Sequence, residues 1–155
     1  AAGYACRRAE PADARPIAEL MASTFIDYPT PIDSDTVRRQ IEDRSHIFRF
    51  MTAADGSVVA SASAEIDHRR GSVEMTDCAT RPDQRGSGHM GYLLHRLAGD
   101  VEEDFGFTDL YTLARADEIG MFLPVTAIAR SNGIASRRAS HIGMLHDGAS
   151  RPSAS

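Results

Sequence analysis

The sequence contains no lysine and no tryptophan, and all 17 of its basic residues are arginine. A nucleoside-triphosphate P-loop needs a lysine that reaches the phosphates, so this chain does not carry one. The six histidines are scattered, without the close pairs with carboxylate or cysteine that metal sites show, and we therefore expect no metal. No apolar run approaches the roughly 18 residues of a membrane-spanning helix, so we expect no membrane partner.

Cysteine is also scarce, with Cys6 and Cys78 as the two thiols. They allow at most one disulfide, and no basic, then apolar, leader precedes them, which predicts reduced thiols in a cytoplasmic protein. The formal net charge is -5, from 17 basic and 22 acidic residues. A non-specific nucleic-acid or anionic-membrane binder needs a surplus of cations, so we expect neither partner.

The 155 residues are 42% hydrophobic and 25% charged, values typical of an ordinary globular domain. We expect one domain over 1–155, with a frayed tail over 148–155. Hydrophobic spacing and turn residues predict the order of its elements. They are a strand over 4–8, a helix after the Glu10–Asp13 break, a helix over 35–42 capped by Asp33 or Ser34, strands over 46–53, 58–67 and 72–80, a long helix ending at Gly106, a strand over 109–116, a helix over 122–132 and a strand over 134–145.

This order predicts an α+β fold, with a mixed and mostly antiparallel sheet and helices on both faces.

Between the third antiparallel strand and the long helix lies a polar loop with glycines at Gly86 and Gly88. The first amides of a helix lack partners within the helix, and the helix dipole favours negative charge there, so a phosphate suits this loop. The segment Gly86-Ser87-Gly88-His89-Met90-Gly91 has the glycine spacing of the dinucleotide fingerprint. That fingerprint belongs to a parallel βαβ unit, whereas the strands before this loop are predicted to be antiparallel, so we expect no dinucleotide site.

The segment Arg85-Gly86-Ser87-Gly88, placed between a fourth strand and a third helix, resembles the acetyl-coenzyme A signature of the GNAT acetyltransferase superfamily. The predicted element order is similar to that fold over nearly the whole chain. The resemblance implies acetyl-coenzyme A as co-substrate, with its pyrophosphate on the loop and its thioester and pantetheine along the end of the fourth strand. The cofactor-binding residues that it implies are Cys78, Thr80, Arg85, Gly86, Ser87, Gly88, His89 and Met90.

Three short segments, 73–80, 112–116 and 28–31, are similar to the beta-lysine acetyltransferases. This narrower resemblance implies acetyl transfer to a side-chain amine of a small diamino acid. Tyr28 and Asp77 are the candidates for holding the second ammonium, and Arg115 for pairing the substrate carboxylate through two hydrogen bonds. Arg115 is equally compatible with a surface position at the end of a strand.

Glu74 lies eleven residues before Arg85, where several GNAT members carry a catalytic glutamate. An alkylammonium has a pKa of about 10.4, so acylation near neutral pH needs a base to remove a proton. Partial burial would raise the pKa of a carboxyl group toward the useful range. Strand alternation predicts Glu74, Thr76 and Cys78 on one face and Asp77 on the other. The alternative for Glu74 is a charged residue on a solvated strand face.

Two other functions remain open. A GNAT-like module could bind an acyl-coenzyme A without turnover, which is favoured by Met90 in place of Gly or Ala and by the lack of tyrosine over 117–135. A protein or peptide amine could also be the acceptor. Glu74 and Asp77 favour the small-molecule enzyme. The sequence leaves the acceptor amine, the general acid and the choice between monomer and homodimer undecided.

Overall fold

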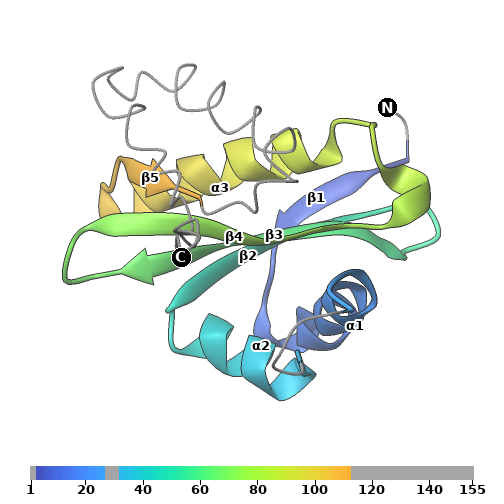
Figure 1. The fold of residues 1–155 in the computed structure, drawn as a ribbon, viewed down its shortest axis with the longest axis horizontal. Coiled ribbons are helices and arrows are strands. Elements are labelled where there is room, and N and C mark those ends of the chain that lie inside the picture. Colours follow the sequence, from blue (N-terminus) through green and yellow to red (C-terminus); the bar gives the residue numbers. More distant parts are fainter. Residues whose placement is uncertain (1–2, 27–31, 113–155) are drawn as a thin grey trace, which may run out of the picture.

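The computed structural model describes residues 3–26 and 32–112, which form one five-stranded sheet with helices on both faces (Figure 1). The elements are β1 (Ala5–Arg8), η1 (Pro11–Asp13), α1 (Ala14–Thr24), α2 (Ser34–Glu42), β2 (His46–Thr52), β3 (Val58–Asp67), β4 (Ser72–Thr80), η2 (Pro82–Gln84), α3 (His89–Phe105) and β5 (Asp109–Tyr111). The strands follow the order β1-β2-β3-β4-β5, antiparallel up to β4, and β5 pairs with β4 in parallel. The predicted α+β class and mostly antiparallel sheet are confirmed. The helix predicted over 122–132, the strand over 134–145 and the tail over 148–155 lie outside the described residues.

The first two helices begin where the local sequence predicts. Asp13 closes a capping box by accepting a hydrogen bond from the Glu10 N–H at 2.8 Å, and α1 starts at the next residue. Asp33 caps α2 by accepting the Thr36 N–H at 2.7 Å, which decides between the two cap candidates. Both helices therefore start at fixed points of the chain.

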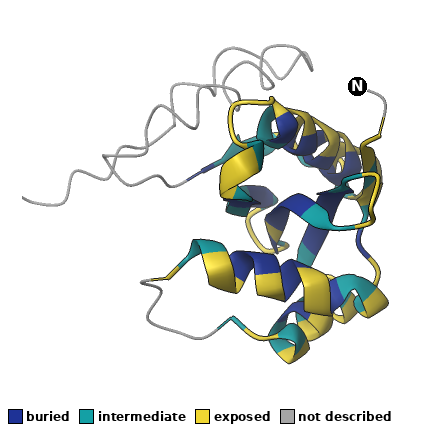
Figure 2. Ribbon diagram, turned by 90° about the vertical axis from the view of Figure 1, so that its right-hand side faces the viewer, coloured by how far each residue is buried: buried dark blue, intermediate teal, exposed yellow. Residues whose placement is uncertain are grey.

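Each face of the sheet is covered by its own cluster of buried side chains, and the buried residues lie toward the sheet in Figure 2. On one face Leu93, Leu94, Leu97 and Val101 of α3 pack against β2, β3 and β4. Full burial of such a side chain stabilises the fold by about 1.5–3 kcal/mol. On the other face α1 packs against the sheet and α2 packs against α1. The middle strands are therefore covered on both faces.

A buried ion pair also links the sheet to α3. The Arg49 guanidinium of β2 donates to the Asp100 carboxylate of α3 from Nε at 2.5 Å and from Nη2 at 2.9 Å. The two residues are 8% and 7% exposed. The hydrogen bonds that the guanidinium donates to the Asp100 carboxylate raise the pKa of the arginine above its ordinary value, so Arg49 stays charged although it is buried.

The β4 strand contains an irregularity that changes which side chains share a face. Its register with β3 shifts between Ser61 and Ser63, and Asp77 has a φ of 53°. A bulge of this kind reverses the alternation of the residues that follow it. Cys78 accordingly packs against the α3 cluster, and Ala79 belongs to the α1 cluster. The prediction that Cys78 shares a face with Glu74 was wrong.

Asp77 also lies on the opposite face from the predicted one. Its Oδ2 accepts a hydrogen bond from the Ser63 hydroxyl at 2.6 Å. Ser63 is paired with Thr76 in the sheet, and paired residues project from the same face. Asp77 therefore shares the face of Thr76 and Glu74, because the positive φ turns its side chain back across the strand.

Candidate active site

Hydrogen bonds hold the loop over 81–88 in place at its start, where it follows β4. The Arg81 N–H donates to the Val59 carbonyl at 2.9 Å, and its guanidinium donates to Asp83 at 2.6 and 2.9 Å. The same guanidinium reaches the Ser57 hydroxyl at 3.1 Å. These bonds join the start of the loop to β3 and to the turn before it.

The glycines of the loop are required by backbone conformation. Gly86 and Gly88 both have a φ of +79°, and a Cβ built on either would meet no atom within 4 Å. A side chain there would be strained by the backbone angle and not by crowding. The segment from Arg85 to Gly88 is exposed to solvent. The loop is thus open and does not collapse onto its own side chains.

A series of amides at the end of this loop is available to a ligand. The first helical hydrogen bond of α3 runs from the Tyr92 N–H to the Gly88 carbonyl at 3.1 Å. The N–H groups of residues 86–91 donate to no acceptor among the residues that the structure describes. Unpaired amides at a helix N-terminus, where the dipole is positive, attract an anion such as a diphosphate.

Some of the predicted cofactor residues have exposed side chains, and others have side chains that are buried in the core. Arg85 is exposed, and its Nε lies 3.4 Å from the Thr80 carbonyl. Met90 packs partly against the α3 cluster, and His89 is 8% exposed. His89 and Met90 can therefore offer backbone amides to a ligand while their side chains serve the fold.

Cys78 cannot act as a nucleophile at ordinary pH. Burial, with a smaller effect of the Asp77 charge, raises the pKa of its thiol to about 12. Its Sγ lies 3.7 Å from the Thr76 carbonyl. The thiol stays protonated, and its backbone alone is available for the role that the resemblance implies.

Glu74 is the third residue of β4 and lies on the face opposite to α3, and burial raises the pKa of its carboxyl group. The negative charges of Glu65 and Asp77 raise that pKa further. A partly buried carboxylate with a raised pKa is a stronger proton acceptor than an ordinary glutamate. Glu74 is therefore half-buried, and its position differs from the fully solvated strand face that was the alternative to a catalytic role.

Three further residues form a row with Glu74 across the sheet. His46 of β2 is paired with Glu65 of β3, Glu65 with Glu74 of β4, and Glu74 with Tyr111 of β5. The His46 Nε2 lies 3.9 Å from a Glu65 oxygen. No sequence motif points to His46, Glu65 or Tyr111. Counting back from the predicted turn over 68–71 would have paired Glu65 with Glu74.

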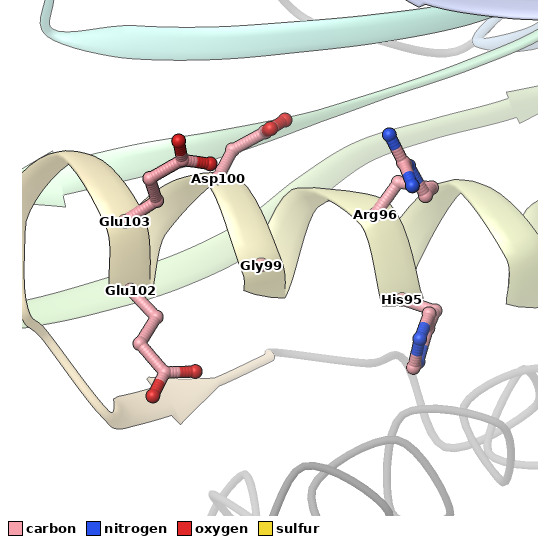
Figure 3. Close-up of a pocket in the computed structure, with 6 residues that line it drawn as sticks. All are labelled: His95, Arg96, Gly99, Asp100, Glu102 and Glu103. Carbon is pink, nitrogen blue, oxygen red and sulfur yellow. The ribbon is translucent and has the colours of Figure 1, made fainter.

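Tyr28 and Arg115, the other predicted substrate residues, lie outside the described residues. A pocket of about 280 Å³ lies elsewhere, on α3 (Figure 3). It is lined by His95, Arg96, Gly99, Asp100, Glu102 and Glu103. None of these is a predicted site residue. Within the described ranges there is no group of residues suited to a metal ion, and no helix long and apolar enough to cross a membrane.

Comparison with known families and sequences gives matches over most of the chain. Residues 15–122 match the Acetyltransferase (GNAT) family. The chain is 37% identical over 119 residues to a protein named Beta-lysine N(6)-acetyltransferase from Methanosarcina mazei, covering 77% of this chain and 43% of that protein. It is 29% identical over 118 residues to the N-acetyltransferase YodP of Bacillus subtilis, with coverages of 76% and 42%. The chain spans about two fifths of the length of these relatives.

Solved structures share the fold at low sequence identity. A predicted acetyltransferase from Clostridium acetobutylicum, solved with acetyl-CoA, superposes with a TM-score of 0.63 at 16% identity, covering 77% of this chain and 86% of that one. An aminoglycoside acetyltransferase from an uncultured soil metagenomic sample, in complex with sisomicin, gives a TM-score of 0.65 at 13% identity, with coverages of 84% and 87%. These likenesses concern the fold alone.

Proposed function

Because the chain belongs to the acetyltransferase (GNAT) family, we propose that it transfers the acetyl group of acetyl-coenzyme A to an amine of a small diamino acid such as beta-lysine. In this proposal residues 1–155 form a single acetyltransferase domain. The observation that carries the proposal is that β4 has Glu74, with its raised pKa, near its start and leads at its end into the open loop of unpaired amides.

The loop fits the diphosphate of the coenzyme. Its amides at residues 86–91 are unpaired among the described residues, its glycines leave the approach open, and Arg85 adds an exposed cation. The backbone at Cys78 and Thr80 would align the pantetheine and the thioester. The coenzyme's diphosphate and thioester lie at opposite ends of the pantetheine arm, so the chemistry belongs further back along β4 than the loop, on the side of Glu74.

Glu74 is the proposed base. Its carboxylate takes a proton from the acceptor ammonium, directly or through water, and the neutral nitrogen then attacks the thioester carbonyl. A C–N bond forms and the C–S bond breaks. The nitrogen gives up its second proton as the departing thiolate takes one up, so the products are the amide and the free thiol of coenzyme A. A raised pKa suits Glu74 to this exchange because it narrows the gap to the pKa of the ammonium.

The charges around Glu74 support a cationic acceptor. Glu65 lies directly across the strands and Asp77 on the same face, and neither carboxylate forms an arginine ion pair within the described residues. Many other acidic groups of the chain do, as Asp13, Asp83 and Asp104 show. A second ammonium on the acceptor would compensate the negative charge at Asp77, where the proposal also assigns Tyr28. Arg115 is proposed to bind the acceptor carboxylate.

The test combines calorimetry and a thiol-release assay. Coenzyme A and acetyl-coenzyme A are titrated into the full chain, and thiol release is followed with beta-lysine, α-lysine, spermidine and a peptide with a free N-terminus. We expect binding of both coenzymes, with the highest kcat/KM for a diamino acid. Binding without thiol release from any acceptor would support the acyl-coenzyme A binding module instead, and release with the peptide alone would support a protein acetyltransferase. Absence of binding would overturn the proposal.

A further inference from the structure

Tyr4, which directly precedes the strand β1, contacts the proposed coenzyme loop. Figure 1 shows the start of β1 beside the loop that leads into α3. The Tyr4 hydroxyl, one residue before β1, donates to the Gln84 Oε1 at 2.8 Å. Its ring lies 4.6 Å from the His89 ring, at an angle of 53° between their planes. Tyr4 therefore contacts the two sides of a loop that is 80 positions away in the sequence.

Gln84 and His89 are the two residues that bracket the open segment over 85–88. Gln84 is the last residue of η2, and His89 is the first residue of α3. The Gln84 Oε1 that accepts the Tyr4 hydroxyl also lies 3.4 Å from the His89 Nε2. One amide oxygen thus connects the start of the open segment, its end and the N-terminal strand.

We propose that Tyr4 is a positioning residue for the coenzyme, acting through Gln84 and His89 to keep the two ends of the 85–88 segment at a fixed separation. This inference rests on the proposed function of the loop. Two glycines within four residues give the free loop a large conformational entropy, which binding must remove. A loop whose ends are already fixed loses less on binding, so the coenzyme binds more tightly.

The role proposed for Tyr4 concerns coenzyme binding, and differs from a part in the chemical step or in the stability of the fold. Tyr4 is 38% exposed and lies at the diphosphate end of the strand, away from Glu74. Loss of its hydroxyl should weaken coenzyme binding and leave the chemical step unchanged. The effect should also require a diphosphate on the ligand, because the loop is the part that Tyr4 holds.

The experiment uses Tyr4→Phe, which removes the hydrogen bond and keeps the ring against His89. The matched control is Tyr92→Phe, the same chemical change at a tyrosine that is 51% exposed on α3. Gln84→Ala removes the acceptor, and the double variant Tyr4→Phe/Gln84→Ala completes a cycle. Coenzyme A affinity is measured by calorimetry, folding by thermal denaturation, and turnover with both acetyl-coenzyme A and S-acetylpantetheine, which lacks the diphosphate.

We expect Tyr4→Phe to weaken coenzyme A binding about threefold to tenfold, the range that one neutral hydrogen bond supplies. The KM for acetyl-coenzyme A should rise by the same factor at unchanged kcat. The kcat/KM for S-acetylpantetheine should match that of the wild type. The double variant should bind coenzyme A no more weakly than Gln84→Ala alone, because the two changes remove the same bond.

The outcomes separate this inference from the function on which it rests. A wild-type protein that does not bind coenzyme A refutes the proposed function. Wild-type binding with equal affinity in Tyr4→Phe and Tyr92→Phe refutes the role of Tyr4 and leaves the function standing. An equal loss of kcat/KM with acetyl-coenzyme A and with S-acetylpantetheine would also refute the role of Tyr4, because S-acetylpantetheine has no diphosphate for the loop to bind. A fall in kcat alone would refute it as well, because a residue that positions the loop changes the KM.

Discussion

The substitution Glu74→Gln tests the chemistry most directly, because it removes the proposed base and keeps the shape of the side chain. Positioned general bases contribute about 10²–10⁴-fold to a rate. Glu74 is only partly buried, so solvent can replace it in part. We therefore expect a fall in kcat near the lower limit, about 10²-fold at pH 7, or about 2.7 kcal/mol of activation free energy.

The pH dependence provides the second readout. The pKa of Glu74 is raised, so on acidification its carboxylate is protonated at a higher pH than that of an ordinary glutamate. Wild-type activity should therefore fall as the pH is lowered through this raised pKa. Without a base, the rate depends on the small fraction of free amine. That fraction grows about tenfold per pH unit below an amine pKa of about 10.4, so the Glu74→Gln rate should rise with this slope toward alkaline pH.

The matched control is Glu65→Gln, the same chemical change directly across the strands, at a side chain that is 54% exposed. Loss of the Glu65 charge removes one cause of the raised pKa of Glu74, so the acid limb should move to lower pH at a nearly unchanged maximum kcat. Steady-state kinetics with the acceptor found in the thiol-release panel measures all three proteins. A Glu74→Gln variant with wild-type kcat at pH 7, or an equal loss in Glu65→Gln, would refute the reasoning.

Three further predictions concern the framework of the site. Asp100→Ala leaves the Arg49 charge buried without its partner and should cost about 3–5 kcal/mol in urea denaturation, whereas a loss below 1 kcal/mol would contradict a buried pair. Gly88→Ala should weaken coenzyme A binding in calorimetry, because a side chain at a φ of +79° costs about 1–2 kcal/mol; Gly99→Ala in the open middle of α3 is the control and should bind normally. Ser61→Ala should raise the unfolding free energy by about 1 kcal/mol, because the buried Ser61 hydroxyl has no partner among the described residues, and a decrease would show that the hydroxyl is satisfied.

Most of the elements within the described residues could be predicted from the sequence, because they depend on nearby residues. Hydrophobic spacing located the strands and helices, and a strand is described over 72–80 as predicted. The strand predicted over 109–116 is described over Asp109–Tyr111, and residues from 113 on lie outside the description. The glycine loop was also recognisable, since positive φ angles at Gly86 and Gly88 are conformations that glycine adopts without cost.

The grouping of the side chains in the candidate site could not be predicted in the same way. A simple alternation placed Asp77 opposite to Glu74, and the bulge in β4 brings the two carboxylates onto one face. The sequence does not reveal the bulge because it arises from pairing with β3, where the register shifts between Ser61 and Ser63.

The sequence by itself determined the order of the described elements, the α+β class and the place of the glycine loop before α3, because turn residues, caps and hydrophobic periods act over a few positions. The tertiary structure alone decided that His46, Glu65, Glu74 and Tyr111 form one row across four strands, and that Tyr4 meets Gln84. These contacts join residues distant in the chain, and they depend on strand register and on packing over the whole sheet.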